Sequence, residues 1–302
     1  MKICVYSFNG ILDDLIMEVY RRGDLVQDWR GADVLVMWQD VMGEMKEIAQ
    51  NARMAGKKVY VAEHGLLSIN DYIPPLAYPL IGNKYMCWGK KSQEYLNKAG
   101  IKDTVVTGTT IFNQMRPKRL HEGKNVLFAP RHWDIELPEN IRIAQELSIL
   151  MESGINVYSK IVEGEHNPDN YPNPISSNRL APNHLMACYD ALKDADVLVT
   201  LGEGTIASLA YYLDIPVVSS DEWETKVLLG KTYTRDIFLS QVSTACHLTP
   251  LNKLNDTILS ELKDPSQRRD LRLKFLNEHI DYQSEESALE KQMKLIYGEE
   301  DK

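Results

Sequence analysis

Short runs of β-branched and apolar residues alternate along the chain with longer segments in which apolar residues recur at helical spacing. In the first third of the chain, the short runs predict strands at Lys2–Phe8, Ala32–Trp38, Lys58–Glu63, Lys84–Trp88 and Thr104–Thr107. The longer segments predict helices at Val41–Ala55 and Ser92–Ala99, each followed by a glycine that can end the helix in the left-handed conformation. This alternation is typical of a parallel sheet flanked by helices.

A polar and basic segment, Asn113–Lys124, interrupts this pattern and contains Pro117 and Gly123. The alternation restarts after it, so we interpret the segment as the connection between two domains. The predicted boundaries are a first α/β domain at 1–115, a linker at 116–124, and a second α/β domain at 125–302 that includes terminal helices. Two such domains place a cleft between the carboxyl ends of their sheets, where ligands commonly bind.

In the second part of the chain, strands are expected at Asn125–Ala129, Asn156–Lys160, Val197–Thr200 and Pro216–Ser219, and helices at Glu139–Ser153, His184–Asp194, Thr205–Leu213 and Glu222–Leu229. The last of these helices is predicted from Asp221 and Glu224, which have the spacing of a capping box. Residues 161–183 contain four prolines and are predicted to form a long loop. From Leu251 onward the pattern is helical, and residues 284–297 are expected to form a final helix that packs on the first domain.

The composition changes this picture little. Hydrophobic residues make up 44% and charged residues 25% of the chain, which excludes intrinsic disorder as the overall class. The apolar runs are too short for a signal peptide or a membrane span. The four cysteines, Cys4, Cys87, Cys188 and Cys246, match no zinc spacing and are expected to be buried, reduced thiols. Together these observations predict a soluble, cytoplasmic protein.

The charge is unevenly distributed. The formal net charge of −9 argues against a protein that is coated in positive charge and binds polyanions indiscriminately. Residues 1–124, however, carry 17 Lys and Arg against 14 Asp and Glu, a net charge of +3, so the remainder carries −12. Residues 84–124 alone have a net charge of +6. A basic first domain is compatible with an anionic partner, and the alternative is an ordinary solvated face.

The strongest local signal for chemistry lies in Ala195–Asp221, where a strand pattern runs into Gly202-Glu203-Gly204-Thr205 and then into a helix pattern. Such a turn presents main-chain N–H groups and the positive end of a helix dipole, which suit a phosphate or diphosphate. Thr205 can add a hydroxyl donor. The alternative is that Gly202 and Gly204 only make a tight turn between strand and helix.

The residues of this segment resemble the second-domain core of GT-B fold glycosyltransferases, in particular the CDP-glycerol glycerophosphotransferases and the UDP-N-acetylglucosamine 2-epimerase-like enzymes. Further segments resemble motifs of these enzymes in the same order: Tyr60–Leu66, Trp88–Gly89, Ser92–Gly100, Val106–Thr110, Val126–Trp133 and Ser159–Pro168. The resemblance covers residues 60–300. It implies an α/β fold of two Rossmann-like domains whose parallel sheets face a central cleft, with C-terminal helices. It also implies that the first domain binds the acceptor and the second a nucleotide-activated donor.

Donor-binding residues are expected in the second domain. Arg131, just past a predicted strand, can offer a planar donor fork to phosphates, and the alternative is a surface arginine paired with a nearby carboxylate. Lys160 and His166 flank the start of the long loop and would complete an electropositive pocket, although an ordinary loop histidine is the alternative for His166. His132 is a weaker candidate. The phosphate-binding turn is assigned to Gly202, Glu203, Gly204 and Thr205.

Transfer to a hydroxyl group needs a general base that works near pH 7. His64 follows a predicted buried strand and is the predicted base, with Glu63 as its orienting partner or substitute, and a structural histidine is the alternative. Gly65 allows the chain or a substrate to approach closely. The acceptor side is further assigned to Asn9, Gly10, Lys90 and Lys91.

One position departs from the pattern of these enzymes. Leu209 stands where they commonly have a glutamate that binds the ribose hydroxyls of the donor, so ribose binding must come from elsewhere. No metal site is expected, because Asp13 and Asp14 fall in a predicted helix and no other acidic pair lies in a convincing loop. Arginine, lysine and a helix dipole can stabilise a diphosphate, so we predict a metal-independent mechanism without a cofactor. The glycine motifs of dinucleotide oxidoreductases and P-loop NTPases do not occur.

The resulting hypothesis is a glycosyltransferase that moves a sugar from a nucleotide sugar, with UDP as the favoured nucleotide, to a hydroxyl acceptor. The basic first domain is compatible with an anionic acceptor such as modified DNA or a wall polymer. A CDP-glycerol-type glycerophosphotransferase on the same scaffold is the main alternative, and sugar-nucleotide epimerisation is the third enzymatic reading. A nucleotide-sugar-binding or polymer-binding protein without catalysis also stays open because of Leu209.

Overall fold

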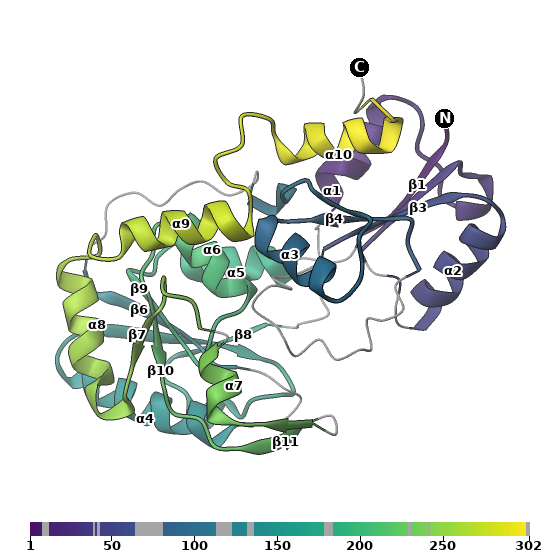
Figure 1. Cartoon of the computed structure of the whole chain (residues 1–302). Helices are drawn as coiled ribbons and strands as arrows, with labels where there is room; N and C mark the ends of the chain where they lie inside the picture. Colours follow the sequence, from purple (N-terminus) through teal and green to yellow (C-terminus); the bar gives the residue numbers. More distant parts are fainter. Residues whose placement is uncertain are drawn as a thin grey trace. The chain divides into compact units, whose positions relative to one another are not determined.

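The computed structural model of the chain describes residues 1–7, 12–38, 40, 43–63, 81–112, 123–131, 136–177, 184–228, 231–240 and 242–299. The chain forms two compact units (Figure 1), which are Met1–Gln114 with Leu276–Lys302, and Met115–Phe275. We call them the first and the second unit. The predicted second domain, 125–302, differs from this division, because residues 276–302 belong to the first unit. Most of the predicted linker, 116–124, lies outside the described residues.

The first unit contains a five-stranded sheet in the order β1-β2-β3-β4-β5, parallel throughout. Its strands are β1 (Ile3–Tyr6), β2 (Val34–Met37), β3 (Lys58–Ala62), β4 (Lys84–Cys87) and β5 (Thr104–Val106). Its first helices are α1 (Asp13–Arg21), α2 (Gly43–Met54) and α3 (Lys90–Lys98). Every strand predicted for this part of the chain is confirmed, and no strand end differs by more than two residues.

The core of the first unit explains why these strand signals are strong. All four side chains of β2 are buried, as expected for a central parallel strand that is covered on both faces. On one of these faces, Leu35 and Met37 belong to a cluster that also contains Ile48, Ala49 and Ala52 from α2. The continuous apolar run in the sequence therefore marks a strand without an exposed face.

The final helix, α10 (Ala288–Tyr297), packs on α1 in the first unit (Figure 1). It begins with a capping box between Ser287 and Glu290. Near its end, the Tyr297 hydroxyl donates a hydrogen bond to Asp24 over 2.7 Å, and the Arg22 guanidinium lies 4.8 Å from the Tyr297 ring centroid. The expected return of the last helix to the first part of the chain is confirmed.

Gly89, the N-cap of α3, lies against the end of helix α9 (Arg269–His279). A Cβ atom at position 89 would lie 2.3 Å from the carbonyl carbon of His279, so a side chain has no room there. His279 itself is largely buried. Burial, together with the positive charge of Lys91, lowers the pKa of its imidazole to about 4. The Trp88–Gly89 motif thus has a packing reason within the first unit.

The depressed pKa of His279 makes the stability of the fold depend on pH. Unfolded, this histidine takes up a proton below about pH 6.5, whereas in the fold it stays neutral down to about pH 4. Stability is therefore lost as the pH falls through this interval, by about 2 kcal/mol between pH 7 and pH 5. Urea unfolding at both pH values measures the loss. The variant His279→Gln should lose less stability than the unaltered chain between these two pH values. An equal loss in the variant and the unaltered chain would contradict the prediction.

The second unit contains a six-stranded sheet in the order β13-β10-β9-β6-β7-β8, which is also parallel throughout. Its strands are β6 (Asn125–Ala129), β7 (Asn156–Val162), β8 (Pro174–Ser177), β9 (Val197–Thr200), β10 (Val217–Ser220) and β13 (His247–Thr249). Figure 1 places α5 (His184–Leu192) and α6 (Thr205–Tyr212) on one side of this sheet, and α4 (Pro138–Glu152) and α8 (Leu254–Lys263) on the other. The predicted α/β class with two parallel sheets is confirmed.

Two predictions for the second unit were wrong, and one strand was not predicted. The expected helix Glu222–Leu229 is instead replaced by an antiparallel hairpin of β11 (Lys226–Leu228) and β12 (Lys231–Tyr233). Here Val227 pairs with Thr232, and β-branched residues favour a strand over a helix. The expected loop 161–183 contains β8, an exposed strand at the sheet edge that begins with a proline and lacks an apolar pattern. The strand that was not predicted is β13.

All four cysteines are buried and free, as predicted from their spacing. Within the described ranges, no helix is both long enough and apolar enough to cross a membrane.

Candidate functional site

The turn between β9 and α6 in the second unit is built as a strand-to-helix corner. Gly202 has a φ of +77°, the left-handed region in which glycine is favoured. Gly204 is the N-cap of α6 in an extended conformation, and the space where its Cβ would lie is open. The first N–H groups of a helix have no acceptor inside that helix, so they are available to an anion.

A buried serine from the neighbouring strand fixes this corner. The N–H of Gly202 donates a hydrogen bond to Ser219 Oγ over 2.9 Å, and Ser219 is completely buried in β10. The corner is therefore held from the side by the strand that pairs with β9. Ser219 is not predictable as a site residue, because a serine inside an apolar strand gives no signal of its partner.

Arg131 reaches the same corner from the end of β6, the other neighbour of β9. Its main chain is held on both sides by the Asn140 side chain: the Arg131 N–H donates to Oδ1 over 3.1 Å, and Nδ2 donates to the Arg131 carbonyl over 2.7 Å. Its guanidinium donates to the Leu201 carbonyl over 3.5 Å. Thus the structure brings Arg131 and the turn at Gly202 together, as the sequence motifs predicted, although their roles stay a prediction.

Glu203 points into the protein. Its carboxylate accepts hydrogen bonds from the Tyr211 hydroxyl and from both the N–H and the hydroxyl of Ser243. Burial raises the pKa of the Glu203 carboxyl, and these hydrogen bonds act in the opposite direction. Its side chain therefore anchors the turn to α6 and to the segment around Ser243.

Lys160 and His166 lie in and just after β7, the strand next to β6. The Lys160 ammonium is buried and donates to Ser177 Oγ over 2.8 Å. Burial raises the pKa of the Cys188 thiol, and the charge of Lys160 opposes this shift.

The ring of His166 is buried and oriented by the main chain. Its Nδ1 accepts a hydrogen bond from the Val162 N–H over 3.1 Å, which leaves the proton of the neutral ring on Nε2. Within the described part of the chain, Nε2 has no hydrogen-bond partner. The ring centroid lies 5.5 Å from that of Tyr171, edge to face. His166 is thus a buried donor that is compatible with the predicted contact to an anion.

Glu63 follows β3 in the first unit and is buried. Its two carboxylate oxygens accept hydrogen bonds from the Trp88 N–H and the Ser92 hydroxyl, each over 2.6 Å. A carboxylate beside the N-terminus of α3 also compensates the positive end of the helix dipole. These contacts support a positioning role for the segment between β4 and α3, and a direct role of Glu63 in catalysis stays a prediction.

If Glu63 acts by accepting these two bonds, Glu63→Gln should cost only about 1 kcal/mol, because the amide keeps one acceptor oxygen and its NH2 can donate to the Ser92 hydroxyl. Glu63→Ala leaves both donors buried without an acceptor and should cost about 2 kcal/mol. Urea unfolding followed by tryptophan fluorescence measures both values. Equal costs for the two variants would show that the hydrogen bonds do not hold this segment.

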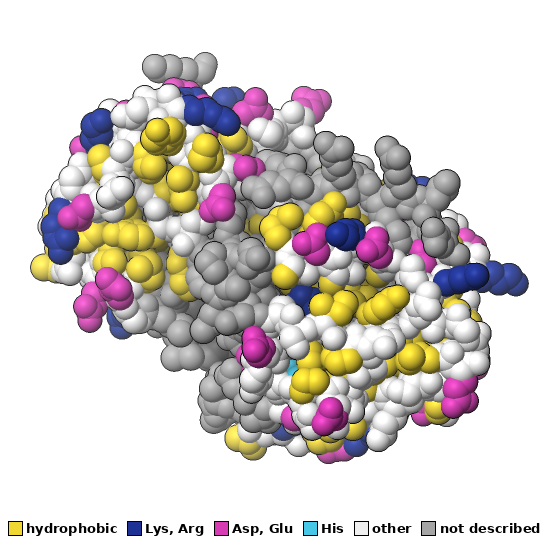
Figure 2. Space-filling model, turned by 180° about the vertical axis from the view of Figure 1, so that it is seen from behind, with side chains coloured by type: hydrophobic (Ala, Val, Ile, Leu, Met, Phe, Trp, Pro, Cys, Tyr) yellow, Lys and Arg dark blue, Asp and Glu magenta, His cyan; other side chains and the backbone are white. Residues whose placement is uncertain are grey.

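Five predicted site residues lie outside the described residues: Asn9, Gly10, His64, Gly65 and His132. Lys90 and Lys91 are described and lie in the first turn of α3, where Lys91 forms an ion pair with Glu94 over 3.3 Å. On the face drawn in Figure 2, the described Lys and Arg side chains are interspersed with Asp and Glu. The assignment of Lys90 and Lys91 to an anionic acceptor stays a prediction.

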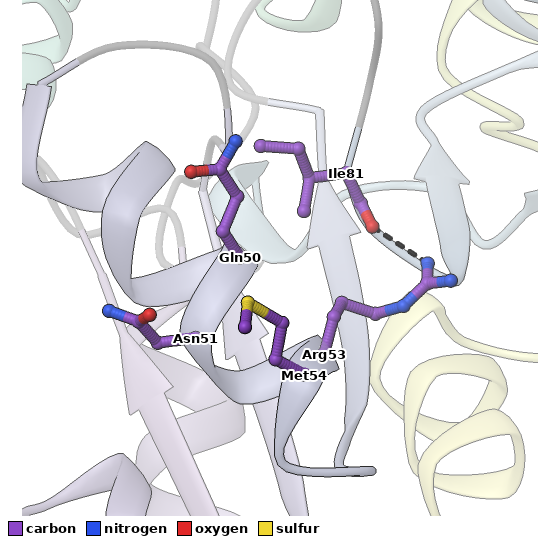
Figure 3. A pocket seen from close by; sticks show the side chains of 5 residues that line it. All are labelled: Gln50, Asn51, Arg53, Met54 and Ile81. Atoms are coloured by element: carbon purple, nitrogen blue, oxygen red, sulfur yellow. Dashed lines mark hydrogen bonds between the residues drawn. The ribbon is translucent and has the colours of Figure 1, made fainter.

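A surface depression of about 450 Å³ in the first unit is lined by residues of α2 and by Ile81 (Figure 3). Arg53 crosses it and donates to the Ile81 carbonyl over 2.7 Å. Met54 on its wall is 86% exposed, so the depression is open to solvent. It contains none of the predicted site residues, and we do not consider it a candidate site. Among the residues that the structure describes, no group of three or more His, Cys, Asp and Glu could hold a metal ion.

The chain thus consists of two α/β units, each with a parallel sheet, and has a glycine turn at the carboxyl end of β9. No protein-family model and no curated protein matches the sequence. Solved structures do match: S. aureus MnaA with UDP is 13% identical with a TM-score of 0.58, covering 99% of this chain and 97% of that one. A variant of the wall teichoic acid polymerase TagF is 12% identical, with a TM-score of 0.56 and coverage of 98% and 88%.

The UDP-GlcNAc 2-epimerase from Methanocaldococcus jannaschii is 15% identical, with a TM-score of 0.51 and coverage of 96% of this chain and 82% of that chain. At such identities the similarity establishes the fold alone. The chain has the GT-B fold, as its motifs predicted.

Proposed function

We propose that the chain is a glycosyltransferase that uses a nucleotide sugar, with UDP as the favoured nucleotide. The observation that carries the proposal is the position of Arg131 at Gly202, beside the N-terminus of α6. A cationic fork and a helix N-terminus at one corner suit the diphosphate of a nucleotide donor. The similarity to MnaA with UDP supports the choice of nucleotide.

In the proposed reaction, an acceptor hydroxyl attacks the anomeric carbon of the sugar and the bond to the diphosphate breaks. His64 takes the proton of the hydroxyl, as proposed from the sequence. The leaving nucleotide gains negative charge, which Arg131 and the N-terminus of α6 stabilise without a metal ion. Lys160 and the Nε2–H of His166 add positive charge and a donor on the side of β7.

The acceptor is proposed to be a polymer. The similarity to a wall teichoic acid polymerase supports this choice, and so does the net charge of +3 of residues 1–124. Modified DNA and a wall polymer both fit an anionic acceptor.

The epimerase among the similar structures favours one second candidate, the epimerisation of a UDP-sugar. An epimerase converts UDP-GlcNAc without an acceptor, whereas a transferase releases UDP in proportion to the glycosylated acceptor. Incubation with UDP-GlcNAc alone, followed by NMR of the sugar, therefore separates the two reactions.

Calorimetric titration with UDP, UDP-GlcNAc and CDP-glycerol tests the proposed donor site. UDP is expected to bind, and Arg131→Ala should weaken it at least about tenfold, because a charge-assisted hydrogen bond is lost. Arg269→Ala is the matched control, since Arg269 is exposed in the same unit and pairs with Asp214. Binding of none of the three compounds would refute the proposal, and binding of CDP-glycerol alone would favour the glycerophosphotransferase.

A further inference from the structure

Two aromatic side chains from separate elements stack beside Arg131. Trp223 lies between β10 and β11, and Phe238 lies in α7 (Arg235–Ser240). Their ring centroids are 4.7 Å apart with an interplanar angle of 4°. Trp223 is 6% exposed and Phe238 is fully buried. Each ring thus covers one face of the other and restricts its rotation.

The Arg131 guanidinium lies next to both rings. Its central carbon is 5.7 Å from the Trp223 ring centroid and 5.9 Å from that of Phe238, within the range of a cation–π interaction. On another side it meets the turn, because a Cβ at Gly202 would lie 2.6 Å from an Arg131 terminal nitrogen and 2.9 Å from the Phe238 ring. The rings and the turn together form a slot for the guanidinium.

The first turn of α4 contacts the residues that form this slot. Glu139 is completely buried there and accepts hydrogen bonds from the Lys226 ammonium over 2.5 Å and from the Glu224 N–H over 2.9 Å. The Lys226 nitrogen in turn lies 5.0 Å from the Trp223 ring centroid. The next residue, Asn140, binds the Arg131 main chain. One helical turn therefore fixes both the backbone of Arg131 and the segment that carries Trp223.

We propose that Trp223 and Phe238 are positioning residues that hold the Arg131 guanidinium against the turn at Gly202 before the nucleotide diphosphate arrives. The ligand class rests on the proposed function, whereas the positioning of Arg131 is a property of the free protein. An arginine on a flexible stem loses side-chain entropy when it binds a phosphate. A guanidinium that is already confined loses less, so preorganisation strengthens nucleotide binding without a new contact to the ligand.

The test uses UDP titration of the full chain with Trp223→Leu, Phe238→Leu and Trp223→Phe. The leucine variants should bind UDP about tenfold more weakly, because they remove a cation–π contact and widen the slot. Trp223→Phe keeps a ring and should recover most of the affinity. Val157→Ala is the matched control: Val157 is buried near the amino-terminal end of β7 in the second unit, away from the carboxyl ends of the strands, and its loss should lower stability without changing UDP affinity.

Combined substitution separates positioning from general damage to the fold. In an Arg131→Met background, Trp223→Leu should change UDP affinity no further, because the residue to be positioned is absent. A full tenfold loss in that background, or a Trp223→Phe variant as weak as Trp223→Leu, would overturn the proposal.

NMR of the free protein tests the position of Arg131 independently of the proposed function. With arginine labelled by 15N, the Arg131 Nε–H signal is identified by its absence in Arg131→Met. Ring currents of the stacked pair should shift it in the unaltered chain, and Trp223→Leu should return it toward the position of solvent-exposed arginines. A chain that shows this shift but binds no UDP would refute the donor site and retain the positioning, whereas an unshifted signal would refute the positioning itself.

Discussion

Replacement of Gly89 by alanine is expected to lower the free energy of unfolding by at least about 3 kcal/mol. The new methyl group would lie 2.3 Å from the carbonyl carbon of His279 and 2.6 Å from the carbonyl oxygens of Glu278 and His279. These are main-chain atoms at the end of α9, and they cannot move aside by a change of rotamer. Either α9 or the start of α3 must shift, and packing in the first unit is lost.

Urea unfolding of Gly89→Ala measures this cost, and Gly31→Ala is its control. Gly31 lies in the same unit, and a Cβ there meets no atom within 4 Å. The control should therefore stay within about 0.5 kcal/mol of the unaltered chain. If Gly89→Ala were equally harmless, the close approach of α9 to α3 would have to be absent in solution.

The central strands of the first unit, β2, β3 and β4, were predictable because nearly all of their side chains are buried, whichever face of the sheet they lie on. The four residues of β2 form an uninterrupted apolar run, and such a run has few other interpretations in a chain with short loops. By contrast, β8 is an exposed edge strand with the sequence PISS, so its residues carry no burial pattern. The hairpin of β11 and β12 was missed because Asp221 and Glu224 imitate a helix start.

The candidate site likewise contains residues whose proximity was predictable and residues whose role was not. Arg131 and the turn at Gly202 follow strand ends, and the carboxyl ends of neighbouring parallel strands meet at one edge of the sheet, so their proximity was predictable. Asn140, Ser219 and Phe238 act through contacts with residues that lie nine or more positions away in the sequence. A single sequence contains no record of such contacts, and an ordinary core phenylalanine has the same local pattern as Phe238.

Two glycines of the sequence motifs have different roles in the structure. Gly89 and Gly202 were both recognised from motif order, but their physical reasons differ: Gly89 allows α9 to approach, and Gly202 leaves space for Arg131 and Phe238. The first reason concerns stability alone. The second concerns the position of a charged group, and it therefore predicts an effect on ligand binding.

Gly202→Ala is accordingly expected to weaken UDP binding by about 100-fold or more, because it affects both parts of the proposed site. The φ of +77° would strain the alanine main chain and thereby disturb the turn before α6. The methyl group would also lie 2.6 Å from an Arg131 nitrogen and 2.9 Å from the Phe238 ring, so the guanidinium must leave its slot. Calorimetric titration with UDP measures the loss.

The control for Gly202→Ala must carry the same main-chain strain without the contact to Arg131. Gly154 meets this requirement: its φ is +82°, it lies in the second unit, and a Cβ there meets no atom within 4 Å. Gly154→Ala should cost about 1 kcal/mol of stability and leave UDP affinity unchanged. Of the two glycines, only Gly202 would place an added methyl group against Arg131. If the two variants bound UDP equally well, the guanidinium at this turn would not bind the nucleotide.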